Sequence, residues 1–192
     1  FAESNPVSDL NGNDSAAKLR ILSSIAFNKT ISKNKILTEG IQNINLTDIL
    51  HAKKLGYKIK LLSISEIKNK KLIERVHPCL ISKHSHLANI DGVLNAVEVE
   101  GDLVGPLWFQ GPGAGAEPTA SAVMGDILSI TQSPEINSYR SATFGSFNIG
   151  SMNDHICQYY IRLTASDKPG VLANVARVLG DAGISISAVL QK

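Results

Sequence analysis

A lysine and an aspartate four residues apart mark the first helix that the sequence predicts. Lys18 lies in the middle of the apolar face of residues 14–27, and Asp14 projects to the same side. The apolar positions of that face are Leu19, Ile21, Leu22, Ile25 and Ala26. Lysine is rarely buried without a partner, so one interpretation is a catalytic lysine held beside carboxylates. In the other, Asp14 only caps the helix and Lys18 only extends past the core edge.

The residues before this helix are acidic and turn-forming. Glu3 opens the run, and Asp9 comes shortly before Gly12. Taken alone, Asp9 is equally well explained as a residue that stabilises the turn before Gly12, and Glu3 as an exposed surface acid.

Several segments together resemble one enzyme family. The run P-x-x-D-L-x-G-x-D-x-x-x-K, present as Pro6, Asp9, Leu10, Gly12, Asp14 and Lys18, resembles the signature of homoserine dehydrogenases. Further similar segments are Glu39 to Ile41, Leu55 to Leu61, Val76 to Pro78, Leu87 to Asn89, Asn95 to Val97 and Gly111 to Gly115. The resemblance covers Phe1 to about Ile130. Asn5 stands where members often carry aspartate.

The resemblance implies a reaction and a role for each acid. Homoserine dehydrogenases interconvert aspartate semialdehyde and homoserine with NAD or NADP. By the family motif, Lys18 takes the hydroxyl proton as the hydride leaves the carbinol carbon. Asp14 and Asp9 hold the lysine and contact the substrate, and Glu3 accepts hydrogen bonds from the substrate ammonium. Neighbouring carboxylates raise the pKa of a lysine, whereas desolvation on domain closure opposes that rise.

A glycine-rich turn, Gly111 to Gly115, invites comparison with a dinucleotide-binding loop. It is followed by Ala-Glu-Pro and lacks the acidic residue expected further on in a βαβ unit. It is therefore either a tight turn that only shapes the backbone or, as the resemblance implies, a strand-to-helix turn whose Gly115 contacts the cofactor. The N-terminal Rossmann fingerprint is absent, so we expect this sequence to be a piece of a longer protein, inactive alone, without the main nucleotide-binding domain.

Composition excludes several other classes of protein. The 192 residues carry a net charge of +2, and the densest basic stretch, Lys68 to Lys71, falls in an expected hairpin turn rather than a nucleic-acid patch. There is no apolar run of membrane-spanning length and no signal peptide at the start. Cys79 and Cys157 are distant from each other, which is typical of reduced, mostly structural thiols in a cytoplasmic protein.

No metal site is expected from the histidines. The spacing of His77, His84 and His86 matches no standard catalytic zinc motif, and no acidic third ligand is near in sequence. We expect them to be loop residues near the dimer-forming sheet.

Periodicity predicts an α+β fold, an open mixed or antiparallel sheet covered by helices. A second helix is expected over residues 47–55, with Thr47 as N-cap and Gly56 as its stop. The expected hairpins pair 57–65 with 71–81, and 94–100 with 103–110 through a turn at 100–102. A further helix is expected over 118–130, with Pro118 in its first turn.

The C-terminal residues predict strand, helix and strand over 159–165, 172–182 and 184–190. Asp167 to Ala173 and Gly183 to Ile186 resemble the opening of an ACT domain, a ferredoxin-like amino-acid-sensing module. The sequence covers about half of that module, so we expect the tail to be poorly stable unless another copy completes it.

We therefore predict three parts: a homoserine dehydrogenase catalytic and dimerisation domain over 1–132, a linker over 133–157 and a truncated ACT-like regulatory domain over 158–192. Expected partners are the small-molecule substrate, an amino-acid effector such as threonine and a second copy in a homodimer or higher oligomer. Two alternatives stay open. One is a non-catalytic amino-acid-binding regulatory dimer, and the other is a purely structural dimer.

Overall fold

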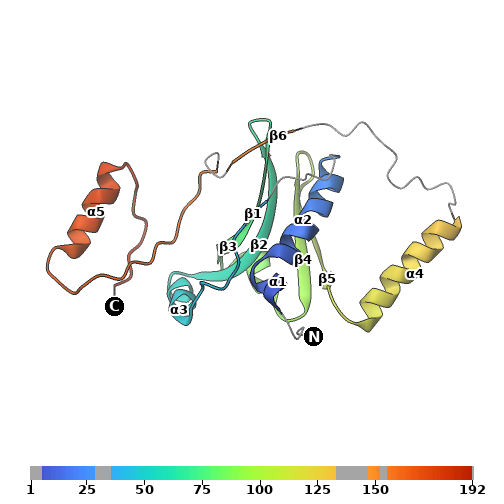
Figure 1. The fold of residues 1–192 in the computed structure, drawn as a ribbon, viewed down its shortest axis with the longest axis horizontal. Coiled ribbons are helices and arrows are strands. Elements are labelled where there is room, and N and C mark those ends of the chain that lie inside the picture. The colour runs from blue at the N-terminus through green and yellow to red at the C-terminus, as the bar shows by residue number, and fades with distance from the viewer. Residues whose placement is uncertain (1–5, 29–35, 133–146, 152–154, 192) are drawn as a thin grey trace.

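The computed structural model describes residues 6–28, 36–132, 147–151 and 155–191, and Figure 1 shows their arrangement. Its elements are α1 (Val7–Leu10), α2 (Asn13–Ala26), β1 (Leu37–Thr38), α3 (Leu46–Lys54), β2 (Tyr57–Lys68), β3 (Lys71–Ser82), the 3-10 helix η1 (His86–Asn89), β4 (Leu94–Gly101), β5 (Gly105–Pro112), α4 (Ala116–Gln132), β6 (Asn148–Ile149) and α5 (Val171–Asp181). The α+β class with open sheets is confirmed.

A long antiparallel hairpin, β2–β3, forms the centre of the larger sheet. Its ladder runs from Tyr57 opposite Ser82 to Lys68 opposite Lys71, which confirms the predicted pairing. Asn69 and Lys70 form the turn with positive φ angles of 51° and 61°, as a two-residue hairpin turn requires. The basic stretch therefore lies in the turn, as predicted.

Two short strands that periodicity did not predict complete this sheet. Both β1 and β6 pair with β3 in parallel, β1 beside Arg75 and Val76, β6 beside Lys71 and Leu72. Each has two residues, too few to show an alternating pattern. The β6 strand lies within 133–157, the segment expected to be a linker, of which residues 133–146 and 152–154 are outside the described residues.

The second predicted hairpin forms a sheet of its own. Strands β4 and β5 pair from Leu94 opposite Pro112 to Gly101 opposite Gly105. The turn therefore spans residues 102–104, two residues later than predicted. The four predicted strands thus belong to two open sheets, and helix α2 lies against the larger one, with α1 beside α2 (Figure 1).

Helix α2 has the predicted extent within one residue, but the face that it buries overlaps the predicted one only at Leu19. Its buried residues are Ala16, Leu19, Ser23 and Ser24. Small side chains let the helix approach closely, and the Ser23 Oγ atom lies 2.8 Å from the Ser65 Oγ atom of β2. Three other residues of the predicted apolar face, Ile21, Leu22 and Ile25, are exposed. Periodicity identified a face but not which face meets the sheet.

Helix α3 begins at Leu46, earlier than predicted, because its N-cap is Asn45 and not Thr47. The Asn45 side chain accepts from the Asp48 amide, and the Asp48 carboxylate accepts from the Asn45 amide, each at 3.0 Å. This reciprocal capping box replaces the predicted Thr47 cap. The predicted stop is confirmed, since Gly56 has a φ angle of 84°.

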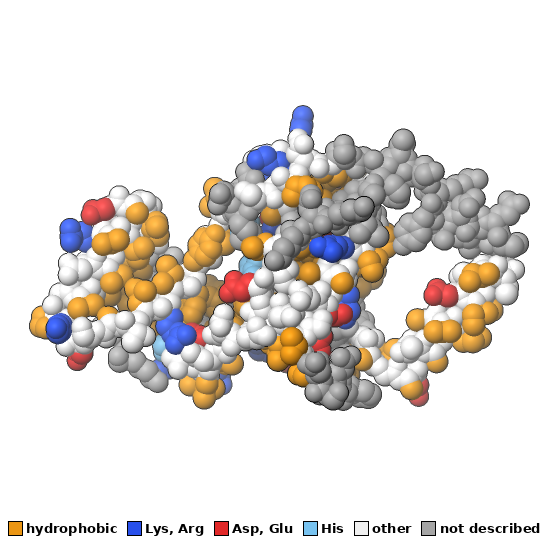
Figure 2. All heavy atoms as spheres, in the orientation of Figure 1, with side chains coloured by type: hydrophobic (Ala, Val, Ile, Leu, Met, Phe, Trp, Pro, Cys, Tyr) orange, Lys and Arg blue, Asp and Glu red, His pale blue; other side chains and the backbone are white. Residues whose placement is uncertain are grey.

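Helices α4 and α5 lie apart from the larger sheet, one on each side in Figure 1. Both were predicted, and Pro118 lies in the first turn of α4 as expected. Neither helix buries a residue, and Figure 2 shows hydrophobic side chains on the visible faces of both. None of the described helices has the length and apolar character needed to cross a membrane.

The two strands predicted around α5 are not formed. Residues 159–165 and 184–190 belong to no ladder in the described part of the chain. Strand structure depends on hydrogen bonds to a neighbouring strand, and these two segments do not pair with each other. The predicted turn before the helix is present, with Gly170 at a φ angle of 86° as the residue that precedes α5.

Candidate functional site

The segment that carries the candidate acids folds as two helices joined by a tight turn at Gly12. Gly12 has a φ angle of 81° and is the N-cap of α2, and its amide donates to the Asp9 carbonyl at 3.3 Å. A Cβ atom at Gly12 would lie 3.0 Å from Thr38 Cγ2 and 3.2 Å from Val76 Cγ1. The turn therefore rests directly on β1 and β3, and glycine is needed for both the φ angle and the close approach.

A second glycine fixes the same turn from the other side. A Cβ atom at Gly40 would lie 2.1 Å from the Leu10 carbonyl oxygen. The next amide, of Ile41, donates to that carbonyl at 2.9 Å, and the Glu39 amide donates to the Val76 carbonyl at 2.8 Å. Two segments singled out in the sequence, Glu39–Ile41 and the acidic turn, are thus held together by backbone contact.

Lys18 and Asp14 are brought together as the helical spacing predicts. The Lys18 Nζ atom lies 2.7 Å from Asp14 Oδ2. The Lys18 side chain is 67% exposed and shares its face with the exposed Ile21 and Ile25, so its expected place beside the buried core is wrong. Asp14 is not the N-cap, because Gly12 is. The result is an accessible amine and carboxylate on an apolar helix face.

Of the other two predicted acids, Asp9 and Glu3, the structure describes only Asp9. Asp9 is an exposed residue of α1, one residue before the Leu10 carbonyl that Gly40 and Ile41 contact. Glu3 lies outside the described residues. The structure therefore joins Asp14 with Lys18 and sets Asp9 at the start of the same turn.

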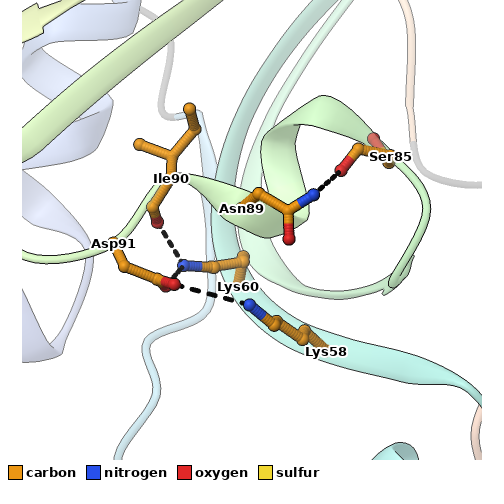
Figure 3. Close-up of polar contacts among 6 residues, drawn as sticks. All are labelled: Lys58, Lys60, Ser85, Asn89, Ile90 and Asp91. Carbon is orange, nitrogen blue, oxygen red and sulfur yellow. Dashed lines mark hydrogen bonds and ion pairs between the residues drawn. The ribbon is translucent and has the colours of Figure 1, made fainter.

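A lysine cluster that was not predicted lies beside η1 (Figure 3). The Lys60 Nζ atom donates to Asp91 Oδ1 at 2.9 Å and to the Ile90 carbonyl, and Lys58 Nζ lies 3.5 Å from Asp91 Oδ2. The hydrogen bond and charge of Lys60, followed by the charge of Lys58, lower the pKa of Asp91 below its ordinary value. These contacts fasten the segment after η1 to β2. Lys58 and Lys60 alternate along a strand, and this spacing alone does not predict that both contact Asp91.

The glycine-rich turn after β5 is packed against the start of β4. The Gly113 amide donates to the Val93 carbonyl at 3.3 Å, and a Cβ atom at Gly113 would lie 1.5 Å from the Asn95 side-chain nitrogen. Gly115 has a φ angle of 125° directly before α4. Glycine is therefore favoured at 115 by its conformation, whereas at 113 a larger residue would have to displace the Asn95 side chain.

No group of three or more His, Cys, Asp or Glu residues is placed to hold a metal ion within the described ranges. His77 is a residue of β3 and not of a loop, so the prediction of a loop position is wrong, and its Nδ1 atom lies 3.4 Å from the Cys79 sulfur. Burial raises the pKa of the Cys79 thiol to about 11, which keeps it protonated at neutral pH.

Comparison with known proteins gives a consistent set of similarities. The family model of homoserine dehydrogenase matches residues 1–128, and that of the ACT domain matches residues 159–192. Homoserine dehydrogenases from Neisseria gonorrhoeae and Helicobacter pylori are 39% and 42% identical, each across all of this chain and 46% of the relative. The crystal structure of a homoserine dehydrogenase from Thiobacillus denitrificans has a TM-score of 0.79 and 38% identity over all of this chain and 46% of that one. The chain thus spans about half the length of the curated relatives it matches.

Proposed function

Because the chain belongs to the homoserine dehydrogenase family, we propose that it supplies the substrate-binding and catalytic part of an NAD- or NADP-dependent oxidoreductase. The reaction is the interconversion of L-aspartate 4-semialdehyde and L-homoserine, a step in threonine, methionine and isoleucine biosynthesis. The observation that carries this proposal is the accessible Lys18–Asp14 pair at 2.7 Å, on a helix whose start is fixed by Gly12.

In this proposal Lys18 is the proton-transfer group. As homoserine is oxidised, its hydroxyl proton passes to the neutral Lys18 amine while the hydride leaves the carbinol carbon, and the carbon–oxygen double bond forms. Asp14 holds the amine in place, and Asp9 and Glu3 bind the substrate, Glu3 through the ammonium group. Covering this exposed face on closure would exclude water from the reacting atoms.

The nicotinamide dinucleotide supplies the hydride acceptor when it is bound. The turn at Gly115 fits a role beside such a group, because a Cβ atom there would meet only Pro118, at 3.5 Å, among the described atoms. We propose that the backbone of Gly115 contacts the cofactor on that open side. Most of the cofactor-binding surface would come from a separate nucleotide-binding domain.

We further propose three parts in the chain: the catalytic and dimerisation domain over 1–132, a linker over 133–157 and an ACT-like regulatory domain over 158–192. The match to the ACT family over 159–192 supports an amino-acid effector such as threonine. A homodimer is supported by the exposed apolar side chains of the smaller sheet, which include Val97, Val99, Leu107, Trp108 and Phe109. Sedimentation of the purified chain would give the oligomeric state.

The test of catalysis is a fusion of the nucleotide-binding domain of the Thiobacillus denitrificans enzyme to this chain. We expect homoserine-dependent reduction of NAD or NADP, followed at 340 nm. Lys18→Ala should lower kcat by roughly 100-fold or more without changing the circular dichroism spectrum. Lys54→Ala, on the exposed side of α3, is the matched control and should keep full activity. Full activity in Lys18→Ala would remove the proton-transfer role.

A second candidate function is favoured by the ACT match over 159–192. In it the chain is a non-catalytic, amino-acid-binding regulatory dimer. Calorimetry of the chain with threonine and with homoserine separates the two: threonine binding together with an inactive fusion supports the regulatory protein, whereas an active fusion supports the enzyme.

A further inference from the structure

A buried carboxylate joins the ACT-like segment to the catalytic part of the molecule. The Asp48 side chain is 4% exposed, and its Oδ1 atom lies 2.9 Å from the Arg162 Nε atom. The Tyr160 hydroxyl donates to the same oxygen, also at 2.9 Å. The other oxygen, Oδ2, accepts the Asn45 amide at 3.0 Å. One side chain thus caps α3 and receives the first residues of the ACT-like segment.

The charge of Asp48 depends on these donors. Burial alone would raise the pKa of this carboxyl, but the Asn45 and Tyr160 hydrogen bonds and the Arg162 charge outweigh burial, so its pKa lies below the ordinary value. Removing Arg162 would leave a buried carboxylate without its cation. The placement of residues 160–162 and the state of the α3 cap are therefore linked.

The α3 cap leads by hydrogen bonds to the turn that carries the proposed substrate acids. Next to Asn45, the Ile44 amide donates to the Ile41 carbonyl at 3.0 Å. The Ile41 amide donates to the Leu10 carbonyl at 2.9 Å, where Gly40 leaves no room for a side chain. Leu10 directly follows Asp9. A short, continuous stretch of chain thus connects the Asp48 carboxylate with the α1–α2 turn.

A second contact of the C-terminal segment reaches the same support. The His155 Nδ1 atom lies 3.4 Å from Glu66 Oε1, and that oxygen also lies 2.7 Å from Arg75 Nη1. Arg75 is buried on β3, next to Val76, whose side chain lies under Gly12. Residues 155–162 therefore contact both β2, through Glu66, and α3, through Asp48, and Glu66 in turn contacts the strand that supports the turn.

From these contacts we propose that Tyr160 and Arg162 are positioning residues that act through Asp48 on the α1–α2 turn. The ACT-like segment would thereby set how well homoserine binds, while the Lys18 chemistry itself is unchanged. The proposal rests on the proposed function for its kinetic consequence. Its structural part, the coupling of Arg162 to the turn, stands on the contacts alone.

Native-state hydrogen exchange of the chain tests the structural part. In Arg162→Met and in the milder Tyr160→Phe, the amides of Ile41 and Gly12 should exchange several-fold faster than in the unchanged chain. Arg177→Met, which alters an exposed arginine of α5, is the matched control and should leave both amides unchanged. Faster exchange confined to residues 155–165 would overturn the coupling.

Kinetics of the active fusion test the consequence. Arg162→Met should raise KM for homoserine roughly three- to tenfold and change kcat less than twofold. Arg162→Lys, which keeps a cation, should restore part of the lost affinity. An unchanged KM, or a loss confined to kcat, would overturn the positioning role. A fusion that is inactive with every native residue contradicts the proposed function instead, and the exchange of Ile41 then decides the coupling.

Discussion

Helices α2 and α5, near the two ends of the chain, differ in how much of their apolar surface is buried. Helix α2 buries four residues against β2 and β3, whereas α5 buries none, although Leu172 and Val178 are both apolar. The difference lies in the neighbouring strands, since β2 and β3 pair over 12 residues each and the segments around α5 pair with nothing among the described residues. An apolar helix face specifies a helix, but a paired sheet decides whether that face is buried.

The two regions also differ in how they are joined to the candidate site. The larger sheet contacts the α1–α2 turn through tightly packed glycines and backbone hydrogen bonds. The C-terminal residues contact the neighbouring elements through charged side chains, Arg162 at Asp48 of α3 and His155 at Glu66 of β2. The glycine packing does not depend on pH, whereas the charged contacts do.

The sharpest contrast between the regions should come from adding one methyl group to each. Gly40→Ala places a Cβ atom 2.1 Å from the Leu10 carbonyl oxygen, so we expect a loss of about 4 kcal/mol or failure to fold. Gly180→Ala, in α5, meets nothing within 4 Å and should stabilise its helix by up to about 1 kcal/mol. Urea unfolding of both variants gives the comparison. A Gly40→Ala protein as stable as the parent would contradict the close packing of the turn.

The Asp48 contacts should make the junction between the regions sensitive to acid. The folded pKa of Asp48 is lowered, so its stabilising contribution is fully present above the ordinary value of 3.8 and is lost as the pH falls through the folded value. Asp48→Asn should therefore unfold about 1–3 kcal/mol more easily at pH 7 and show a smaller further loss toward acid. Unfolding free energies at pH 7 and at lower pH test this sign. An Asp48→Asn protein with the parent's full acid sensitivity would contradict it.

The sequence determined the elements whose patterns are local. The pairing of β2 with β3 was predicted from two strand-forming runs around the basic stretch Lys68 to Lys71, and the Lys18–Asp14 pair follows from helical spacing. The buried face of α2 could not be read from periodicity, because Ser23 and Ser24 are buried through contact with a distant strand. The sequence predicted a cap for α3 at Thr47 and gave no sign of the contact between Asp48 and Arg162, since these residues lie far apart in the chain.

Two lysines of β2, Lys58 and Lys60, should contribute differently to stability although both contact Asp91. Lys60→Met removes bonds to the Asp91 carboxylate and the Ile90 carbonyl from a side chain that is 27% exposed, and should cost about 1 kcal/mol. Lys58→Met removes a 3.5 Å contact from a side chain that is 42% exposed and should cost less than about 0.5 kcal/mol. Thermal unfolding of the two variants measures the difference. Equal losses would show that Ile90 adds nothing to the contact.

The smallest effect concerns the thiols, one in each region. The Cys79 thiol of β3 has a pKa raised to about 11 by burial, whereas Cys157 is exposed in the C-terminal segment. A maleimide reagent at pH 8 should therefore label Cys157 first and Cys79 only slowly, with no change in stability. Mass spectrometry of the labelled peptides over time checks the order. Faster labelling of Cys79 would mean that the sheet does not protect it.

The central claim is that the Lys18 amine carries the proton of the reacting hydroxyl group. The most direct measurement is chemical rescue of the Lys18→Ala fusion with added methylamine and ethylamine. The proposed role predicts that homoserine oxidation returns as the concentration of free amine rises, and that Lys54→Ala shows no such response. A Lys18→Ala fusion that is fully active without added amine would contradict the claim.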